Sequence, residues 1–255
     1  GRRSMIILSF TEQLDFILNK VAGGENFSLS RYGDGELAII EGRKIGKETQ
    51  AYEVDGWHTD GNAGVFAEDL RASLNREEEN FFYGIPCVCC HGEENKNKYI
   101  EMINNDNILF ANLLVNANFR HFVSYLIGGL EREVVLIANE EGCDKEYPFN
   151  VVDAMWVKEE CIEWYNGHKK DILASLKDMA ENHSDTLFLV SAGPLANIMV
   201  DKLYEYNPDN TYLDIGSPLD VFTKGVMTRP YQDPNTYFAN LECSFSWPIK
   251  IEDHS

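Results

Sequence analysis

Residues 186–220, TLFLVSAGPLANIMVDKLYEYNPDNTYLDIGSPLD, contain the pattern that decides the fold class. Residues 187–190 form a short apolar run and residues 212–215 a mostly apolar one, and the intervening residues 195–206 have helical spacing. A strand, a helix and a strand of these lengths form a βαβ unit, whose strands pair in parallel through a right-handed crossover. Pro194 suits the start of the helix, where its missing N–H has no partner to lose. We therefore predict an α/β fold with a Rossmann-like, open and mostly parallel sheet flanked by helices.

A second block, FSLSRYGDGELAIIEG at residues 27–42, places an acidic loop between a short strand at 27–30 and a helix at 37–41. Asp34 and Glu36 can turn towards a shared point if the backbone curls, and Gly33 and Gly35 allow the positive φ that such a curl often needs. Carboxylates completed by water and phosphate are the usual ligands of Mg²⁺ or Mn²⁺ at phosphate sites. The alternative is a simple turn in which Asp34 caps the following helix.

Polar residues follow several of the predicted strands. In open α/β sheets, ligands bind beyond the carboxyl ends of the strands, so these groups could converge on one crevice. The free amides of the turn before residue 195 point to where a phosphate would lie. The groups concerned are the Arg31 loop, Asn139 and Glu140 after a strand at 133–138, the turn at 191–193, and Asp214. The sequence has no complete GxGxxG or Walker A element, which argues against a standard dinucleotide or P-loop site.

The remaining pattern is consistent with one large domain. Ser9 and Glu12 have capping-box spacing ahead of a first amphipathic helix. Further strands are expected at 81–85 and 150–157, and helical segments at 93–128 and 162–179. Residues 1–4 resemble a cloning remnant, 5–222 form the predicted domain, and 223–255 an irregular segment packed on it. Trp57, in a polar loop, is a candidate lid or sugar-stacking group.

The net charge of −20 over 255 residues excludes a surface that recruits nucleic acid or anionic membrane. No apolar run is long enough to span a bilayer. A small anionic ligand remains compatible with this charge if a metal, an Arg or a helix N-terminus compensates for it locally, as Arg31 could. The sequence is compatible with a homo-oligomer but does not specify one.

Six cysteines occur in a chain that is long enough to need no disulfides, which favours a reducing compartment and a cytoplasmic location. Cys87 and Cys90 form a CxxC pair that is followed by His91. A structural zinc would need a fourth ligand that this pattern does not supply, so we predict free thiols at a strand end.

The two blocks together resemble the GT-D type glycosyltransferases, a group first described as a bacterial domain of unknown function. The family's Arg-aromatic-Gly-Asp-Gly-Glu motif carries an Asp-x-Glu metal-binding pair, which Asp34 and Glu36 match here. Its C-terminal Gly-Pro turn and Asp-Ile-Gly strand end are matched by residues 192–194 and 214–216.

The resemblance implies a GT-D type fold and a metal-dependent enzyme that transfers a hexose from a nucleoside diphosphate sugar, such as UDP-glucose, to a glycan on a protein or polysaccharide. Mn²⁺ or Mg²⁺, held by Asp34 and Glu36, would bridge the diphosphate and neutralise charge on the leaving group. The predicted donor-binding residues are Arg31, Tyr32, Gly33, Gly35, Asn139, Glu140, Ser191, Ala192, Gly193 and Pro194.

An inverting enzyme also needs a general base, for which Glu36, Glu140, Asp214 and Asp220 are candidates. Asp34, Glu36 and Asp214 are the predicted catalytic residues. Two other functions use the same residues differently. A metal-assisted phosphohydrolase or nucleotidyltransferase would employ the same acidic loop, and a carbohydrate-binding scaffold would need it only as a helix cap.

Overall fold

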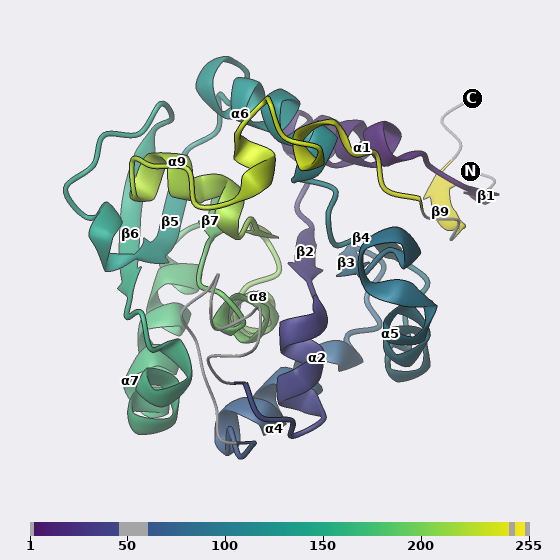
Figure 1. Ribbon diagram of the computed structural model, residues 1–255. Coiled ribbons are helices and arrows are strands. Elements are labelled where there is room, and N and C mark those ends of the chain that lie inside the picture. The colour runs from purple at the N-terminus through teal and green to yellow at the C-terminus, as the bar shows by residue number, and fades with distance from the viewer. Residues whose placement is uncertain (1–2, 46–60, 245–247, 253–255) are drawn as a thin grey trace.

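The computed structural model describes residues 3–45, 61–244 and 248–252, so Trp57 lies outside the described part of the chain. Its main sheet contains seven strands, and every neighbouring pair is parallel (Figure 1). The strands follow the order β4 (Ile108–Phe110), β3 (Phe81–Ile85), β2 (Ser28–Arg31), β8 (Thr211–Asp214), β7 (Leu187–Val190), β5 (Val134–Asn139) and β6 (Val151–Val157). The predicted α/β class and parallel sheet are confirmed.

Each face of the sheet packs against its own layer of helices, because buried side chains alternate along the strands. In β5, Val135 and Ile137 join one apolar core, whereas Val134 and Leu136 join the other. The first core includes side chains of α2 (Asp34–Ile40), α4 (Val65–Ala72), α7 (Cys161–Asn182) and α8 (Leu195–Tyr206). The second includes side chains of α1 (Phe10–Ala22) and α6 (Phe119–Gly128) (Figure 1). No helix of the described residues is both long and apolar enough to cross a membrane.

Local signals placed several elements correctly. Ser9 caps α1, and its Oγ accepts the N–H of Glu12 at 3.3 Å while the Glu12 carboxylate accepts the N–H of Ser9 at 2.7 Å. The predicted strand at 187–190 and helix at 195–206 match β7 and α8, and β7 pairs in parallel with β8. The helical interpretation of 93–128 was incomplete, because the short strand β4 separates α5 (Val88–Met102) from α6.

The C-terminal segment crosses the end of the sheet and reaches α6 (Figure 1). It contains α9 (Asp220–Thr223), two 3₁₀ turns, η5 (Pro230–Gln232) and η6 (Phe238–Asn240), and β9 (Ile249–Glu252). The Tyr231 ring packs edge-on against Phe119 with centroids 5.2 Å apart. β9 pairs with β1 (Arg3–Ile6), so Arg3 and Ser4 belong to a strand that lies against the end of the chain.

Candidate functional site

The carboxyl ends of β2 and β8 are tied together directly. The backbone N–H of Arg31, the last residue of β2, donates to Asp214 Oδ2 at 2.9 Å. Asp214 is the last residue of β8 and is only 4% exposed. The parallel register therefore brings two of the predicted site residues into contact at the same edge of the sheet.

The Arg31 guanidinium binds backbone carbonyls around this junction. Its Nε donates to Asp214 O at 2.8 Å, one terminal nitrogen donates to Ala111 O at 2.8 Å, and the other donates to Ile215 O at 2.5 Å. These bonds use three of the five guanidinium N–H groups. Arg31 thus fastens the loops that follow β8 and β4, and it is half-buried at the rim of the sheet.

Gly216 leaves the space that the guanidinium occupies. Its φ is +67°, and a Cβ at this position would lie 2.3 Å from a terminal nitrogen of Arg31. Two independent constraints therefore require glycine here, the left-handed backbone and the close approach of a charged side chain.

Burial raises the pKa of Asp214 to about 6, and the Arg31 charge and N–H bond oppose this increase. The carboxyl group is held beneath the rim and is bonded to the backbone of Arg31. This geometry favours a role in positioning the loop that begins at Arg31.

The acidic loop is helical in the structure. α2 begins at Asp34, and the Gly33 N–H donates to Glu36 Oε2 at 2.9 Å. The expected positive φ is absent: Gly33 has a φ of −122°, and Gly35 lies within α2. Because positions i and i+2 of a helix do not face each other, the carboxylates of Asp34 and Glu36 leave the first turn in different directions. The side chain of Asp34 is 53% exposed, while Glu36 is half-buried.

His91 is a neighbour of the acidic pair that the sequence did not reveal. Its Nδ1 lies 4.0 Å from Asp34 Oδ1, and its side chain is 25% exposed. His91 lies in the first turn of α5, before Gly92 interrupts the helix with a φ of +79°. No spacing rule links residues 34 and 91, because the contact depends on β2 and β3 being neighbours.

The turn that leads into α8 lies at the same edge. Ser191 Oγ donates to Gly216 O at 3.0 Å, and Gly193 has a φ of +55°. Pro194 occupies the N-cap of α8, whereas the sequence predicted it at the first helical position, one residue further into the helix. Ala192 is buried. The N-terminus of this twelve-residue helix carries the positive end of its dipole.

α8 also contacts the end of β2 through Asn197, which the sequence did not single out. Its Nδ2 donates to Ser30 Oγ at 2.9 Å and to Arg31 O at 2.7 Å, and the residue is fully buried. The start of α8 and the Arg31 loop are therefore held in a fixed relation.

Asn139 is the last residue of β5 and Glu140 follows it, and β5 is separated from β2 by β7 and β8. Three strand spacings correspond to about 14 Å across the sheet. Asn139 Oδ1 accepts the Glu141 N–H at 2.9 Å, and Glu140 forms an ion pair with Lys158. These two residues lie on the same edge but are not in contact with the Arg31 junction.

Tyr32 is part of the core. Its ring is fully buried, and its hydroxyl lies 2.7 Å from Ser73 Oγ. Burial raises the pKa of Tyr32, so the phenol stays protonated. Its side chain has no surface with which to contact a ligand.

Solved structures with the same arrangement of elements exist. A structure of the domain of unknown function 1792, DUF1792, is similar with a TM-score of 0.54 and 16% identity, covering 86% of this chain and 82% of that one. A second DUF1792 structure, described as a distinct glycosyltransferase fold, has a TM-score of 0.53 and 15% identity, covering 94% and 91%. This chain has the DUF1792 fold.

A third DUF1792 structure, described as a new glycosyltransferase from Streptococcus sanguinis, has a TM-score of 0.53 and 19% identity over 88% of this chain and 86% of that one. No protein-family model and no curated protein matches the sequence. The predicted resemblance to GT-D type glycosyltransferases is therefore confirmed at the level of the DUF1792 fold.

Proposed function

We propose that this protein is a metal-dependent glycosyltransferase that moves a hexose from a UDP-glucose-like donor to a glycan acceptor on a protein or polysaccharide. The observation that carries the proposal is the junction of β2, β8 and α8, where Arg31 and the N-terminus of a long helix share one edge of the sheet. In a chain with a net charge of −20, this edge supplies local positive potential for a diphosphate.

The charge of Glu36 in α2 acts on a group beside the same turn. Burial raises the pKa of the Cys161 thiol to about 12, and the charges of Glu160 and Glu36 contribute to this increase. A Cβ on Gly193 would lie 4.0 Å from the Cys161 sulfur. The Glu36 carboxylate is therefore near enough to the start of α8 to influence groups beside it.

The oxygen donors at the start of α2 fit Mn²⁺ or Mg²⁺, which bind carboxylates and leave positions for water and phosphate. Asp34 presents an exposed carboxylate, whereas Glu36 is already anchored by the Gly33 N–H. Asp34 would be the main protein ligand, and Glu36, whose Oε2 accepts the Gly33 N–H, would be the second. When bound, the cation would act as a Lewis acid on the leaving diphosphate.

Burial and position along the sheet support a choice among the candidate general bases. Asp214 and Asp220 are buried, and Asp220 Oδ2 accepts the Thr228 hydroxyl at 2.6 Å. Glu140 lies three strands from β2. We therefore propose that Glu36 has the best position to accept the acceptor's proton, in which case Asp34 alone anchors the cation to the protein.

Thermal shift with UDP-glucose and Mn²⁺ tests the proposal. Ligand at 100 times its Kd stabilises a protein by about 2.7 kcal/mol, which corresponds to roughly 5–11 °C in Tm for a chain of this size. We expect Asp34→Asn to abolish this metal-dependent shift and sugar transfer, while Asp15→Asn retains both. Asp15 is a matched control because it is 61% exposed and its carboxylate lies 3.6 Å from His121.

Glu36→Gln separates the two roles of Glu36. If Glu36 is the base, the variant loses transfer but keeps the Mn²⁺-dependent shift, and if it is a necessary ligand, both are lost. Wild-type turnover in both the Asp34 and the Glu36 variants would refute the proposed site. Release of inorganic phosphate without sugar transfer would instead identify a phosphohydrolase.

A further inference from the structure

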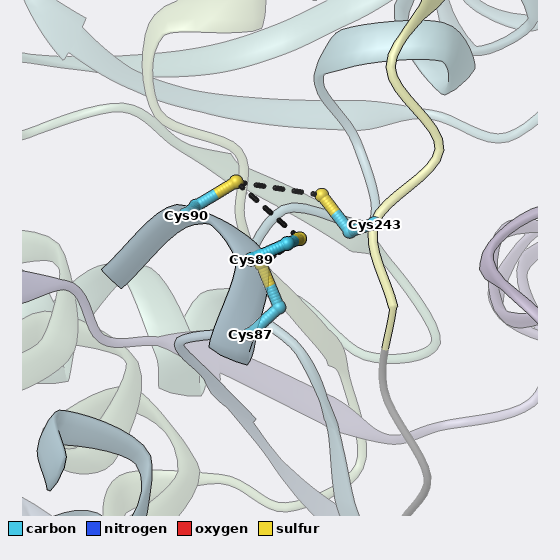
Figure 2. A group of neighbouring side chains, drawn as sticks. All are labelled: Cys87, Cys89, Cys90 and Cys243. Atoms are coloured by element: carbon cyan, nitrogen blue, oxygen red, sulfur yellow. Dashed lines mark hydrogen bonds between the residues drawn. The ribbon is translucent and has the colours of Figure 1, made fainter. Parts of the chain in front are cut away.

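Four cysteine side chains that are far apart in the sequence meet at one point (Figure 2). Cys87, Cys89 and Cys90 lie at the start of α5, directly after β3, and Cys243 comes from the C-terminal segment after η6. All four sulfur atoms lie within 4.8 Å of one another. The fourth ligand that the CxxC pattern lacked is thus supplied by the fold, 153 residues from Cys90.

The sulfur–sulfur distances are close to those of a metal-binding tetrahedron. Cys87 and Cys89 are 3.3 Å apart, Cys89 and Cys90 are 3.9 Å apart, and Cys90 and Cys243 are 3.7 Å apart. Tetrahedral Zn²⁺ with Zn–S bonds of about 2.3 Å requires sulfur separations of about 3.8 Å. A disulfide requires about 2.05 Å, and all four cysteines are free thiols in the structure.

The surroundings of the sulfurs are suited to thiolates. Asn116 Nδ2 donates to Cys243 Sγ at 3.4 Å, and the Ser244 N–H donates to Cys89 Sγ at 3.4 Å. Asn112 Nδ2 lies 3.9 Å from the sulfurs of both Cys87 and Cys243. N–H groups that point at the ligand atoms hold them in place and offset their negative charge, as partners outside the first shell do in metal sites.

The position of Asn116 also supports a site for thiolates. It is 6% exposed and has a φ of +52°, in the left-handed region that asparagine adopts more readily than most residues other than glycine. Its side-chain amide is thereby directed at the buried sulfur of Cys243. A buried amide that donates to a sulfur suits a thiolate, because a charged acceptor forms a stronger hydrogen bond than a neutral thiol does.

We propose that Cys87, Cys89, Cys90 and Cys243 bind one structural Zn²⁺ ion. A site with four protein ligands leaves no open position for a substrate, so this ion fastens the fold. It joins the C-terminal segment to the turn after β3, and it fixes the turn in which His91 approaches Asp34. The sulfur ligands distinguish it from the oxygen site at Asp34, since soft thiolates select zinc and hard carboxylates select Mg²⁺ or Mn²⁺.

The first test is the metal content of the full chain purified without chelator. We expect about one zinc per chain, falling to less than about a tenth in Cys87→Ala and Cys243→Ala. Cys143→Ala is the matched control, because Cys143 is an exposed cysteine outside the cluster, and it should retain the full equivalent. Far-UV circular dichroism establishes that each variant is folded, and none of these measurements depends on transferase activity.

Cobalt identifies the ligands even if an alanine variant does not fold. Replacing zinc by Co²⁺ in the wild-type chain should produce the intense visible bands and thiolate-to-cobalt charge transfer of a tetrahedral sulfur site. Chelation should expose four additional thiols to a thiol reagent. Absence of stoichiometric metal, iron in place of zinc, or a thiol count showing a disulfide within the cluster would each overturn the assignment.

Discussion

Replacing Asp214 with Asn should remove a contribution that lowers the free energy of unfolding of this protein as the pH rises. Burial keeps the Asp214 carboxyl protonated up to about pH 6 in the folded chain, against an ordinary value of 3.8. Between these values the native state binds more protons than the unfolded chain, so this group makes the free energy of unfolding fall as pH rises. The amide introduced by Asp214→Asn would retain an oxygen that can accept the Arg31 N–H, but it has no charge to bury.

The size of the effect follows from the same two values. Their separation corresponds to about 3 kcal/mol over the whole titration, of which about 2 kcal/mol falls between pH 4.5 and pH 7.5. As the pH rises from 4.5 to 7.5, the free energy of unfolding of Asp214→Asn should therefore increase by about 2 kcal/mol relative to that of wild type, or roughly 4–8 °C in Tm. Arg31, from the neighbouring strand, is the charged group that opposes the burial, and its charge does not change in this range.

Urea unfolding of both proteins at several pH values measures the difference directly. Subtracting the two curves cancels the titration of groups that Asp214 does not influence, and Asp15→Asn serves as an exposed control that should stay parallel to wild type. If the free energies of unfolding of Asp214→Asn and wild type differ by the same amount at every pH, within about 0.5 kcal/mol, the prediction is refuted. Additivity between distant groups holds to about that level. If Asp214→Asn instead becomes more stable relative to wild type as the pH falls, Arg31 stabilises the Asp214 carboxylate by more than burial destabilises it.

Three further substitutions test the packing of the site and the scaffold. Gly216→Ala should lower the free energy of unfolding by at least about 3 kcal/mol, because the new methyl group both displaces the Arg31 guanidinium and strains the left-handed backbone. The control Gly225→Ala should cost only the backbone strain of about 1–2 kcal/mol, because Gly225 has a φ of +68° and no atom within 4 Å of an added Cβ. Equal losses for the two variants in urea unfolding would contradict this prediction. Arg31→Lys should lower the free energy of unfolding by about 2–5 kcal/mol, because a lysine ammonium cannot donate to the three carbonyls that the planar guanidinium contacts. Arg43→Lys, at an exposed arginine, should change the free energy of unfolding by no more than about 0.5 kcal/mol. Ser9→Ala should lower Tm by roughly 2–4 °C through loss of a cap of about 1 kcal/mol, and Ser9→Thr should restore most of it; no difference between the two would argue against the capping box.

The sequence predicted the elements whose signals are local. The capping box at Ser9, the βαβ unit from β7 to β8 and the strand at 81–85 depend on residues close together in the chain, and all three are present. β4 was missed because three residues are too few to show a period, and it lies inside a run with helical spacing.

Errors at the acidic loop have a different origin. The pattern Gly-Asp-Gly-Glu permits either a curled loop or a helix start, and the bond from the Gly33 N–H to Glu36 selects the helix. α2 therefore begins three residues before the predicted position, at Asp34. Burial of the apolar residues 37–40, which follow in the same helix, favours the same outcome.

Long-range contacts were outside the reach of sequence patterns. Arg31 was predicted to bind phosphate because it lies beside two carboxylates, but the carbonyls that it contacts come from residues 80 to 184 positions away. Cys243 was not recognised as a partner of Cys87 and Cys90 because it comes from the C-terminal segment, 153 residues from Cys90, and no spacing rule links residues so far apart.

The contacts of Arg31 and Asp34 determine how their variants can be interpreted. Arg31 holds two loops as well as facing the candidate site, so a loss of activity in an Arg31 variant is explained equally well by a displaced loop. Asp34 is more than half exposed, and His91 is 4.0 Å from its carboxylate. Its substitution by Asn should leave the free energy of unfolding nearly unchanged, since an exposed charge at a helix N-terminus contributes only about 0.3–1 kcal/mol. A loss of metal-dependent donor binding in a fully stable Asp34→Asn protein would therefore report on ligand chemistry alone.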